Sequence, residues 1–435
     1  MTGFLALLTA FGPVATDMYV PSMPEIGRLL GADAVTVQLT LSAYLIGFAV
    51  GQIVYGPISD HYGRKPVLLA ALALFCGASL VCALAPEIVT LIVARALQAL
   101  GGAGAIVLAR AIVRDLYSGE RAGRELSRMG AVMSIAPVVA PLIGGLVQAW
   151  LGWRANFIII VAIGTATAAV SWRLLPETLP RRATAPIAIA STIRGFTVFA
   201  NDRGFVANLA IVALSYAGLF AWISGSPFVL QDVYGLTALQ FSVAFSTACL
   251  GALVGAAVAA SLVVRIGLDR TLGLGTFALA AGGLGMAASL ALGWTRVAPL
   301  VLFMVLYHAG LMFTMPQAIA SAMMPFAARA GSASSFIGLV QQVSAASLGT
   351  IVGYAIGRSA WPLAGALAAA GCLSLLVWAR SRGVRGDSMR AAQVAQQDVQ
   401  FLTNNPVPLR EAFQRTHVAA MPKPMRRAMQ PVQRA

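Results

Sequence analysis

The stretch GPISDHYGRKP, residues 56–66, is a short charged segment between two long apolar runs. Residues 36–58 lead into it and residues 67–84 follow it, and neither run contains Asp, Glu, Lys or Arg. The glycines at 56 and 63, together with charges of both signs, are typical of a tight turn. The stretch therefore predicts a loop that joins two membrane helices and leaves almost no slack between them.

The composition of the whole chain indicates the same environment. The protein has 435 residues, of which 59% are hydrophobic and 10% are charged, whereas a soluble domain carries about a quarter charged residues. The net charge of +15 does not indicate a nucleic-acid partner, because the basic residues are spread over short loops and the C-terminal tail. The four cysteines lie inside apolar runs, so we expect small buried side chains rather than disulfides or a metal site.

Twelve apolar runs are long enough to cross a lipid bilayer, which needs about 20 residues each. They are residues 3–22, 36–58, 67–84, 88–109, 127–149, 155–174, 204–226, 238–262, 272–292, 297–322, 333–356 and 361–379. The sequence predicts an all-α integral membrane protein with twelve transmembrane helices. The first run starts directly at the N-terminus, without a basic region or a cleavage site, so no cleaved signal peptide is expected.

The distribution of Arg and Lys predicts the orientation. With the N-terminus in the cytoplasm, the cytoplasmic loops hold fifteen Arg and Lys and the opposite loops hold four. Because positive charge accumulates in cytoplasmic loops, both termini are expected on that side.

An internal repeat at an offset of 204 residues divides the chain. Ser22, Gly31, Gly47, Gly51 and Gly63 each meet the same residue type 204 positions later. Two six-helix halves of like orientation form an architecture whose substrate site lies at the half-to-half interface. The expected domains are a first half at 1–174, a central cytoplasmic loop at 175–203, a second half at 204–380 and a disordered basic cytoplasmic tail at 381–435. Within the central loop, residues 187–200 are suited to an amphipathic helix on the inner membrane surface.

Asp17 and Arg95 are the ionisable residues that lie well inside predicted membrane helices. A carboxyl group at such depth can bind and release protons near neutral pH, so Asp17 is the candidate proton-coupling acid or the counter-charge of a cationic substrate. The alternative is a structural ion pair or a cap near the helix end. A buried guanidinium needs a partner, and Asp17 is the intramembrane acid on offer to Arg95; backbone carbonyls are the alternative.

Other polar side chains within the runs are candidates for lining a cavity, although each could equally make a satisfied helix–helix hydrogen bond. They are Tyr44, Gln52, Gln98, Asn208, Tyr216, His308, Gln317, Gln341 and Gln342.

Two further sets of residues suggest conformational roles. In the fifth helix, Pro137 and Pro141 remove backbone hydrogen bonds and predict a kink, and Gly144 and Gly145 permit close packing beside it. An ordinary kinked membrane helix would show the same pattern. In the first loop, two partners are open to Asp60: the N-terminus of the eleventh helix near residues 331–335, where it would act as a latch, or Arg64 next to it.

The chain contains no nucleotide-binding loop and no catalytic constellation, so we expect neither ATP drive nor an enzyme. No metal-ligand cluster is present in a sequence with three His and scattered Cys.

Several of these stretches resemble those of a known family. The spacing of Gly56, Asp60, Gly63, Arg64 and Lys65 resembles the loop between the second and third helices of the major facilitator superfamily. Together with Thr16 to Pro21 and Pro24, Arg95 to Gly104, Arg110 to Asp115 and Ala136 to Gly145, it resembles the Bcr/CflA-type multidrug resistance transporters. Arg95-x-x-Gln98 resembles the superfamily's fourth-helix motif, which is linked there to proton transfer. The fifth-helix segment resembles the family's antiporter motif but departs from it, with Ala136 before the first proline and a second proline at 141.

The resemblance implies proton-driven export of drugs such as chloramphenicol or bicyclomycin across a bacterial inner membrane. It also implies no cofactor beyond the proton gradient, and we expect a monomer with protons, a small-molecule drug and lipid as partners. Two alternatives stay open. One is the export of a natural metabolite, such as a sugar or amino-acid derivative. The other is a membrane sensor that signals through residues 381–435, which deletion of that tail would distinguish from a carrier.

Overall fold

The computed structural model describes residues 2–117, 119–179, 189–294, 296–357 and 359–404, and within these ranges every regular element is helical. The chain divides into two compact units, Met1–Arg385 and Gly386–Ala435. Among the described residues, the segments that could cross a membrane lie in the first unit, apart from Gly386 at the end of the last one, Trp361–Gly386, which is the first part of α14 (Trp361–Asn404).

Twelve helical segments of the described chain are long and apolar enough to span a bilayer, and each of the twelve predicted runs coincides with one of them, with only Leu292 of the run 272–292 outside. The first span, Gly3–Leu29, consists of three short pieces, α1 (Thr2–Asp17), η1 (Val20–Ser22) and α2 (Met23–Leu29). The others are α3 (Ala34–Tyr62), α4 (Arg64–Leu84), α5 (Ile88–Leu116), α6 (Gly119–Leu151), α7 (Trp153–Leu174), α9 with η2 (Arg203–Val233), α10 (Ala238–Ile266), α11 (Leu268–Ala291), α12 (Val297–Met323), α13 (Ala330–Ile356) and the first part of α14.

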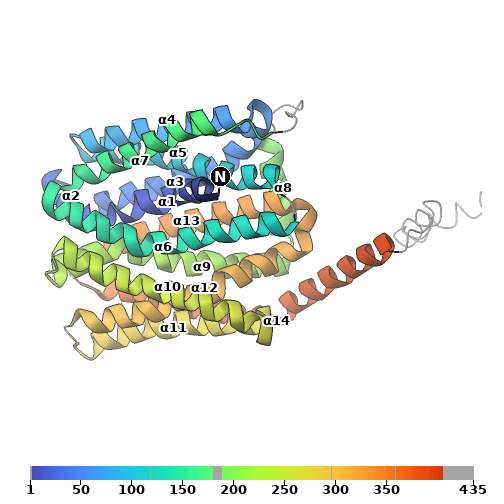
Figure 1. Cartoon of the computed structure of the whole chain (residues 1–435). Helices are drawn as coiled ribbons and strands as arrows, with labels where there is room; N and C mark the ends of the chain where they lie inside the picture. The colour runs from blue at the N-terminus through green and yellow to red at the C-terminus, as the bar shows by residue number, and fades with distance from the viewer. Residues whose placement is uncertain (1, 118, 180–188, 295, 358, 405–435) are drawn as a thin grey trace, which may run out of the picture. The chain divides into compact units, whose positions relative to one another are not determined.

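The spanning helices lie side by side, so the bundle has two ends (Figure 1). We call the end that holds α2 the α2 end, and the end that holds α8 (Ile189–Ala200) the α8 end. The chain turns at the α8 end around Gly63 and Gly267 and at the α2 end around Gly31 and Gly235.

The charged stretch 56–66 is more helical than a loop. Helix α3 continues to Tyr62 and α4 starts at Arg64, so Gly63 alone reverses the chain, with φ 106° and ψ 155°. The glycine conformation makes this possible, because a side chain at that φ would be strained. The predicted tight connection is confirmed, but Gly56 lies inside α3 rather than in a turn.

The glycines of the sequence repeat have the same packing role in both copies. A Cβ on Gly47 of α3 would lie 2.1 Å from the Ala96 carbonyl oxygen on α5, and one on Gly251 of α10 would lie 2.0 Å from the Val305 carbonyl oxygen on α12. Glycine at these positions lets the helix backbones approach closely. The helix pairs α3–α5 and α10–α12 are accordingly among the most closely packed of the bundle.

The helices pack in two groups, with α1 and α3–α7 in one and α9–α13 in the other, and α3–α13 and α6–α10 are the main contacts between them. The first part of α14 joins the second group, where Ala368 lies against Gly283 and Gly371 against Leu279 of α11. One apolar cluster contains side chains of both groups, for example Tyr19 and Leu41 from the first and Trp222 and Phe228 from the second. The other two clusters are built from the first group alone, or from the second group with α8. Shared apolar packing is therefore concentrated towards the α2 end.

The central segment contains the helix that its composition favours. Helix α8 covers Ile189–Ala200, whereas residues 187 and 188 lie outside the described residues. Its Phe199 ring packs at 5.0 Å from Phe326, and Phe196 packs at 4.9 Å from Phe336 on α13. These contacts attach α8 to the second group.

The start of the predicted disordered tail needs correction. Helix α14 continues through Asn404, so residues 381–404 are helical, and residues 405–435 lie outside the described part. The segment is rich in Ala, Gln and Arg and contains no proline, a composition that suits a helix as well as a polar coil. The first unit also extends to Arg385, which is buried and donates to the Asp269 carboxylate at 2.7 Å.

Candidate functional site

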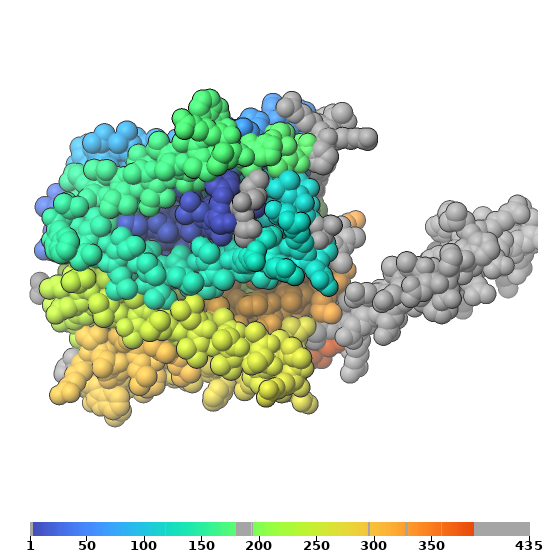
Figure 2. All heavy atoms as spheres, viewed as in Figure 1, coloured from blue at the N-terminus to red at the C-terminus, as the bar shows by residue number. Residues whose placement is uncertain are grey.

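A cavity of about 470 Å³ lies between the two groups of helices. Its apolar lining includes Leu45 and Phe48 of α3 and Leu219, Phe220 and Met315 of the second group. The polar groups that line it are Thr16, Asp17, Tyr44, Gln52, Arg110, Tyr216, Ser334, Gln341 and Gln342. Towards the α8 end, the surfaces of α6 and α10 part, and atoms of the α12–α13 segment are visible behind them (Figure 2). The volume and the mostly apolar lining are typical of a small-molecule site.

Asp17 stands at the break in the first span. Helix α1 ends at Asp17, and Pro21, four residues later, has no N–H to donate to the Asp17 carbonyl, so the helix cannot continue regularly. The Asp17 side chain is 5% exposed and lines the cavity. Its carboxyl group makes no hydrogen bond or ion pair with the residues that the structure describes.

Arg95 of α5 is fully buried and has other partners than Asp17. Its guanidinium donates to the Ala15 carbonyl oxygen at 3.0 Å and to Gln98 Oε1 at 2.6 Å. It also lies between the rings of Tyr19 and Tyr44, at 4.6 and 4.3 Å from their centroids. The Ala15 carbonyl belongs to the last turn of α1, where carbonyls lack helical partners, so Arg95 caps the broken helix.

The structure thus brings Arg95, Gln98 and Tyr44 together and leaves the Asp17 carboxyl facing the cavity. Gln98 completes a chain of hydrogen bonds by donating to Ser79 Oγ at 2.8 Å. Tyr44 donates to the Gly12 carbonyl oxygen at 3.3 Å and also lines the cavity. The backbone-carbonyl alternative for Arg95 is the one observed in this conformation.

Five of the nine polar candidates line the cavity: Tyr44, Gln52, Tyr216, Gln341 and Gln342. The other four, Gln98, Asn208, His308 and Gln317, do not line it. His308 of α12 is buried and faces α10, with Nδ1 at 3.0 Å from the Met304 carbonyl oxygen and Nε2 at 3.8 Å from Cys249 Sγ.

Sequence reasoning missed the cavity position of Thr16, Arg110 and Ser334. The apolar run predicted at residues 88–109 ends just before Arg110, but α5 continues to Leu116 and places Arg110 on the cavity wall. The sequence signal for the longer helix is that apolar residues continue at helical spacing after residue 109, at Ile112, Val113 and Leu116.

The proline- and glycine-rich segment of α6 lies between the cavity and two neighbouring elements. Helix α6 is continuous from Gly119 to Leu151, with Pro137 lining the cavity and Pro141 buried. A Cβ on Gly144 would lie 2.3 Å from the Met18 carbonyl oxygen, beside the break in the first span. A Cβ on Gly145 would lie 2.1 Å from Ser242 Oγ on α10. The two glycines therefore let α6 approach both the first span and the second group.

At the α8 end, Arg64 is the centre of a cluster of charged residues in the first group of helices. It forms ion pairs with Asp60 at 2.6 Å and with Asp115 at 2.8 Å. Glu177 accepts from the backbone N–H of Arg64 at 2.9 Å and of Lys65 at 3.3 Å, and the Lys65 ammonium donates to the Trp172 carbonyl oxygen. Of its two possible partners, Asp60 therefore has Arg64 in this conformation.

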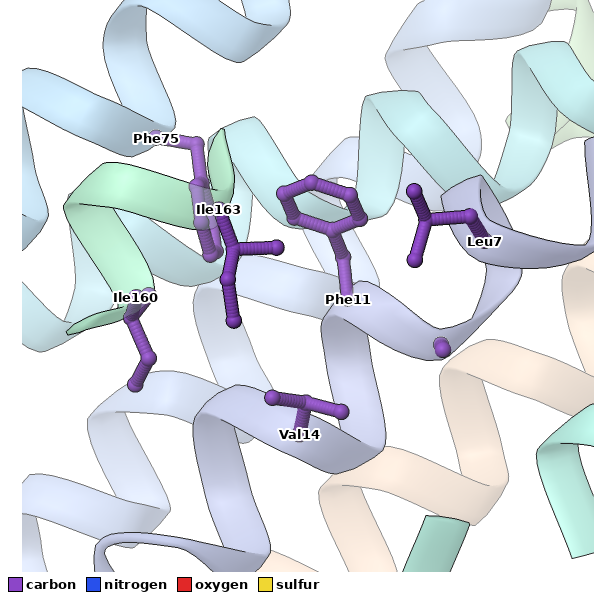
Figure 3. A pocket seen from close by; sticks show the side chains of 7 residues that line it. Leu7, Phe11, Val14, Phe75, Ile160 and Ile163 are labelled. Atoms are coloured by element: carbon purple, nitrogen blue, oxygen red, sulfur yellow. The ribbon is translucent and has the colours of Figure 1, made fainter. Parts of the chain in front are cut away.

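Two further cavities lie elsewhere. One of about 700 Å³ at the α2 end is lined by polar side chains that include Glu25, Arg28 and Asp232. The other, of about 80 Å³, lies between α1, α4 and α7, and the side chains that surround it, such as Phe11, Phe75 and Ile163, carry only carbon atoms (Figure 3). The first has charged and polar side chains in its lining and the second has none, whereas the central cavity combines the buried Asp17 carboxyl group with a largely apolar lining.

Comparison with known proteins identifies the architecture. The sequence profile of the Major Facilitator Superfamily matches residues 5–350. The chain belongs to the Major Facilitator Superfamily. It is accordingly a transport protein rather than an enzyme, and a multi-pass membrane protein, which in bacteria resides in the inner membrane.

Relatives within the superfamily come from several bacteria. An uncharacterized MFS-type transporter, YdgK of Bacillus subtilis, is 39% identical over 55% of this chain, and the match spans 60% of the length of that protein. A bicyclomycin resistance protein homolog of Haemophilus influenzae is 28% identical over 86% of this chain and 94% of the relative. The multidrug resistance protein MdtL of Salmonella heidelberg is 32% identical over 76% and 82%.

Solved structures of the superfamily share the fold at low sequence identity. A peptide transporter POT in complex with sulfate superposes with a TM-score of 0.72 at 17% identity, over 89% of this chain and 94% of that one. The xylose transporter XylE of E. coli superposes with a TM-score of 0.69 at 14% identity, over 88% and 96%.

Proposed function

We propose that this chain exports small amphipathic drugs, of the chloramphenicol or bicyclomycin kind, in exchange for protons. The observation that carries the proposal is the Asp17 carboxyl group, which faces a largely apolar cavity between the two groups of helices and makes no ion pair or hydrogen bond with the described residues. An intramembrane acid without a fixed partner can take up and release a proton as the cavity changes sides. The names of the Haemophilus and Salmonella relatives support drugs as the substrate class.

The proposed mechanism is alternating access between two six-helix halves, residues 1–174 and 204–380, with both termini in the cytoplasm. The apolar cluster that both groups share lies towards the α2 end, whereas α6 and α10 part towards the α8 end. With the α8 end in the cytoplasm, this is an inward-facing conformation. Drug then enters from the cytoplasm or the inner leaflet, and Asp17 is protonated on the outer side as the drug leaves.

Gly56, Asp60, Gly63, Arg64 and Lys65 are proposed to latch the α8 end. Asp60 is half-exposed and pairs with Arg64 in the open conformation. When the α8 end closes, the N-terminus of α13 offers free N–H groups and partial positive charge that suit the Asp60 carboxylate. As the α8 end closes, Asp60 would leave Arg64 and bind the N-terminus of α13. This exchange would join the first group of helices to the second at that end.

Drug-stimulated proton release from inverted membrane vesicles tests the proposal. The native chain should release protons when an amphipathic antibiotic is added, and Asp17→Asn should lose at least nine-tenths of this response, because an amide cannot carry the proton. Asp33→Asn is the matched control: Asp33 is exposed, caps the N-terminus of α3 by accepting from the Thr36 N–H, and lies outside the cavity, and asparagine caps equally well. Equal coupling by Asp17→Asn and the native chain would place the proton site elsewhere.

Export of a natural metabolite is the second candidate, favoured by the three amides of Gln52, Gln341 and Gln342 in the cavity. The same vesicles distinguish the two. Proton release on addition of sugar or amino-acid derivatives, with no response to any antibiotic at equal protein level, would replace the drug assignment.

A further inference from the structure

The second group of helices presents an unpartnered amide to the central cavity. Gln342 of α13 lines the cavity and is 5% exposed. Its side-chain Oε1 is buried, and the amide makes no hydrogen bond with any residue that the structure describes. Because a buried amide without a partner is costly, a ligand that supplies the missing hydrogen bond gains binding energy there.

The charged groups of the cavity lie on the opposite wall. Asp17 belongs to α1 and Arg110 to α5, both in the first group of helices. The wall formed by α9, α12 and α13 presents uncharged hydrogen-bonding groups, Tyr216, Ser334, Gln341 and Gln342, among apolar side chains such as Phe220 and Met315. A substrate that spans the cavity therefore meets charge on one side and neutral hydrogen-bonding groups on the other.

We propose that Gln342 is a specificity-determining residue, through which the cavity selects uncharged substrates that carry hydroxyl or amide groups. The inference rests on the proposed export function and names the class of substrate for that cavity. A primary amide both donates and accepts, so it can satisfy a hydroxyl, a carbonyl or an amide. A lipophilic cation without polar hydrogens or acceptors leaves Gln342 unpaired, and a site of this kind discriminates against such a compound.

A second glutamine provides a matched control. Gln38 of α3 is 1% exposed, and both of its amide atoms also lack partners. It does not line the cavity, however, and lies instead against Gly353 of α13, where a Cβ would be 2.4 Å from Gln38 Oε1. Replacement of either glutamine by an apolar residue removes a buried amide that has no hydrogen-bond partner. Of the two, Gln342 is the one that can contact a substrate in the cavity.

The test is binding to the purified full-length chain in lipid nanodiscs at constant pH. The two probes are chloramphenicol, which is uncharged and carries hydroxyl and amide groups, and tetraphenylphosphonium, a permanent cation without hydrogen-bonding groups. Gln342→Met keeps the side-chain volume and removes the amide. It should raise the Kd for chloramphenicol about tenfold, the loss of one hydrogen bond, and leave the Kd for tetraphenylphosphonium within about twofold. Gln38→Met should leave the ratio of the two Kd values unchanged.

Gln342→Glu gives an independent measurement if Gln342→Met does not fold. The added negative charge should move the ratio of the two Kd values towards tetraphenylphosphonium by about tenfold or more. An unchanged ratio in both variants, or an equal shift in Gln38→Met, overturns the assignment of Gln342. If the native chain binds neither probe, the drug-export proposal is refuted, and the substrate class inferred from Gln342 is refuted with it. Chloramphenicol binding by the native chain with an unchanged ratio in the variants refutes Gln342 alone.

Discussion

Arg95 is a buried guanidinium without a carboxylate partner among the described residues. Its guanidinium instead lies against the rings of Tyr19 and Tyr44 and donates to the Ala15 carbonyl oxygen, where α1 breaks off. A cation against aromatic faces gains about 2 kcal/mol when desolvated, and the Ala15 carbonyl adds a charge-assisted hydrogen bond. Nη1 makes the hydrogen bonds to the Ala15 carbonyl and Gln98, whereas Nε and Nη2 are buried without a hydrogen-bond partner among the described residues. Arg95 is thus held without an ion pair to Asp17, whose side chain lines the cavity.

Glu177 shows how one carboxylate can support a helix end. It accepts from the N–H groups of Arg64 and Lys65 at the start of α4, and of Thr178 and Leu179. Partial burial acts to raise the pKa of Glu177, but the backbone hydrogen bonds outweigh it and hold the pKa below its ordinary value of 4.5. A depressed pKa in the folded state means that the stabilisation is fully present above about pH 4.5 and is lost as the pH falls through the lower folded value.

The prediction for Glu177 is a pH-dependent difference in thermal stability. Glu177→Gln should unfold at a lower temperature than the native chain at pH 7, because a neutral amide accepts more weakly from the α4 N-terminus. The two melting temperatures should converge as the pH falls from 4.5 through the lowered pKa of the folded state, where the native carboxyl becomes protonated. Thermal unfolding of the two proteins, followed from neutral pH down to well below pH 4.5, measures this. A difference that stays constant over the whole range would contradict it.

At the scale of the helix, glycine spacing decides which helices approach closely. Gly47 and Gly56 both lie within α3, yet a Cβ on Gly47 would collide with the Ala96 carbonyl oxygen, whereas one on Gly56 would meet nothing within 4 Å. The first glycine serves helix–helix packing. In this conformation the second makes no close helix–helix contact, so its effect on stability is the cost of glycine in a helix.

These two glycines form a matched pair for mutation. Gly47→Ala should destabilise the chain by about 1–3 kcal/mol, because α3 and α5 must move apart to admit the methyl group. Gly56→Ala should be neutral or stabilising by up to about 1 kcal/mol. The melting temperatures of both variants in the same detergent are the measurement. A comparable loss in Gly56→Ala would mean that alanine disturbs α3 itself rather than its contact with α5.

At the scale of the whole molecule, the contact between α3 and α13 joins the two groups of helices. Ser42 bonds to Thr350 at 2.9 Å, and Gln38 and Gln52 lie against Gly353 and Gly338 in an antiparallel arrangement. Glycine on α13 leaves room for the long side chains of α3. Gln38 is the costly member of this contact, because both of its amide atoms are buried without partners. Separation of the groups at the α2 end would expose Gln38 to water.

Gln38→Met should therefore stabilise the conformation that is closed at the α2 end. Removal of an unpartnered amide is worth about 1–3 kcal/mol, and the gain applies only while the residue is buried. The variant should have a higher melting temperature and a slower drug efflux in cells at equal protein level, since opening of the α2 end becomes less favourable. Efflux that is faster than native, or an unchanged melting temperature, would contradict this account.

Much of the fold could be predicted, because membrane insertion imposes a pattern that is local in the sequence. Each span must satisfy its own backbone hydrogen bonds and present apolar side chains over about 20 residues, so all twelve runs were visible from hydropathy alone. The helix ends were less visible. Helices α5 and α3 continue past their apolar runs, which is why Arg110 lies on the cavity wall and Gly56 lies inside a helix.

The sequence by itself determined the membrane-spanning class, the twelve spans, the glycine repeat and Asp17 as an acid at membrane depth, because each depends on residue type and position along the chain and not on which helices meet. The tertiary structure alone decided which polar groups meet. In the folded chain Arg95 donates to the Ala15 carbonyl and to Gln98, and Asp60 forms an ion pair with Arg64. Some of the glutamines line the cavity, and others lie in the contact between α3 and α13. The physical reason is that hydrogen bonds and ion pairs between helices depend on helix rotation and on breaks such as the one after Asp17, which spacing along one helix does not record.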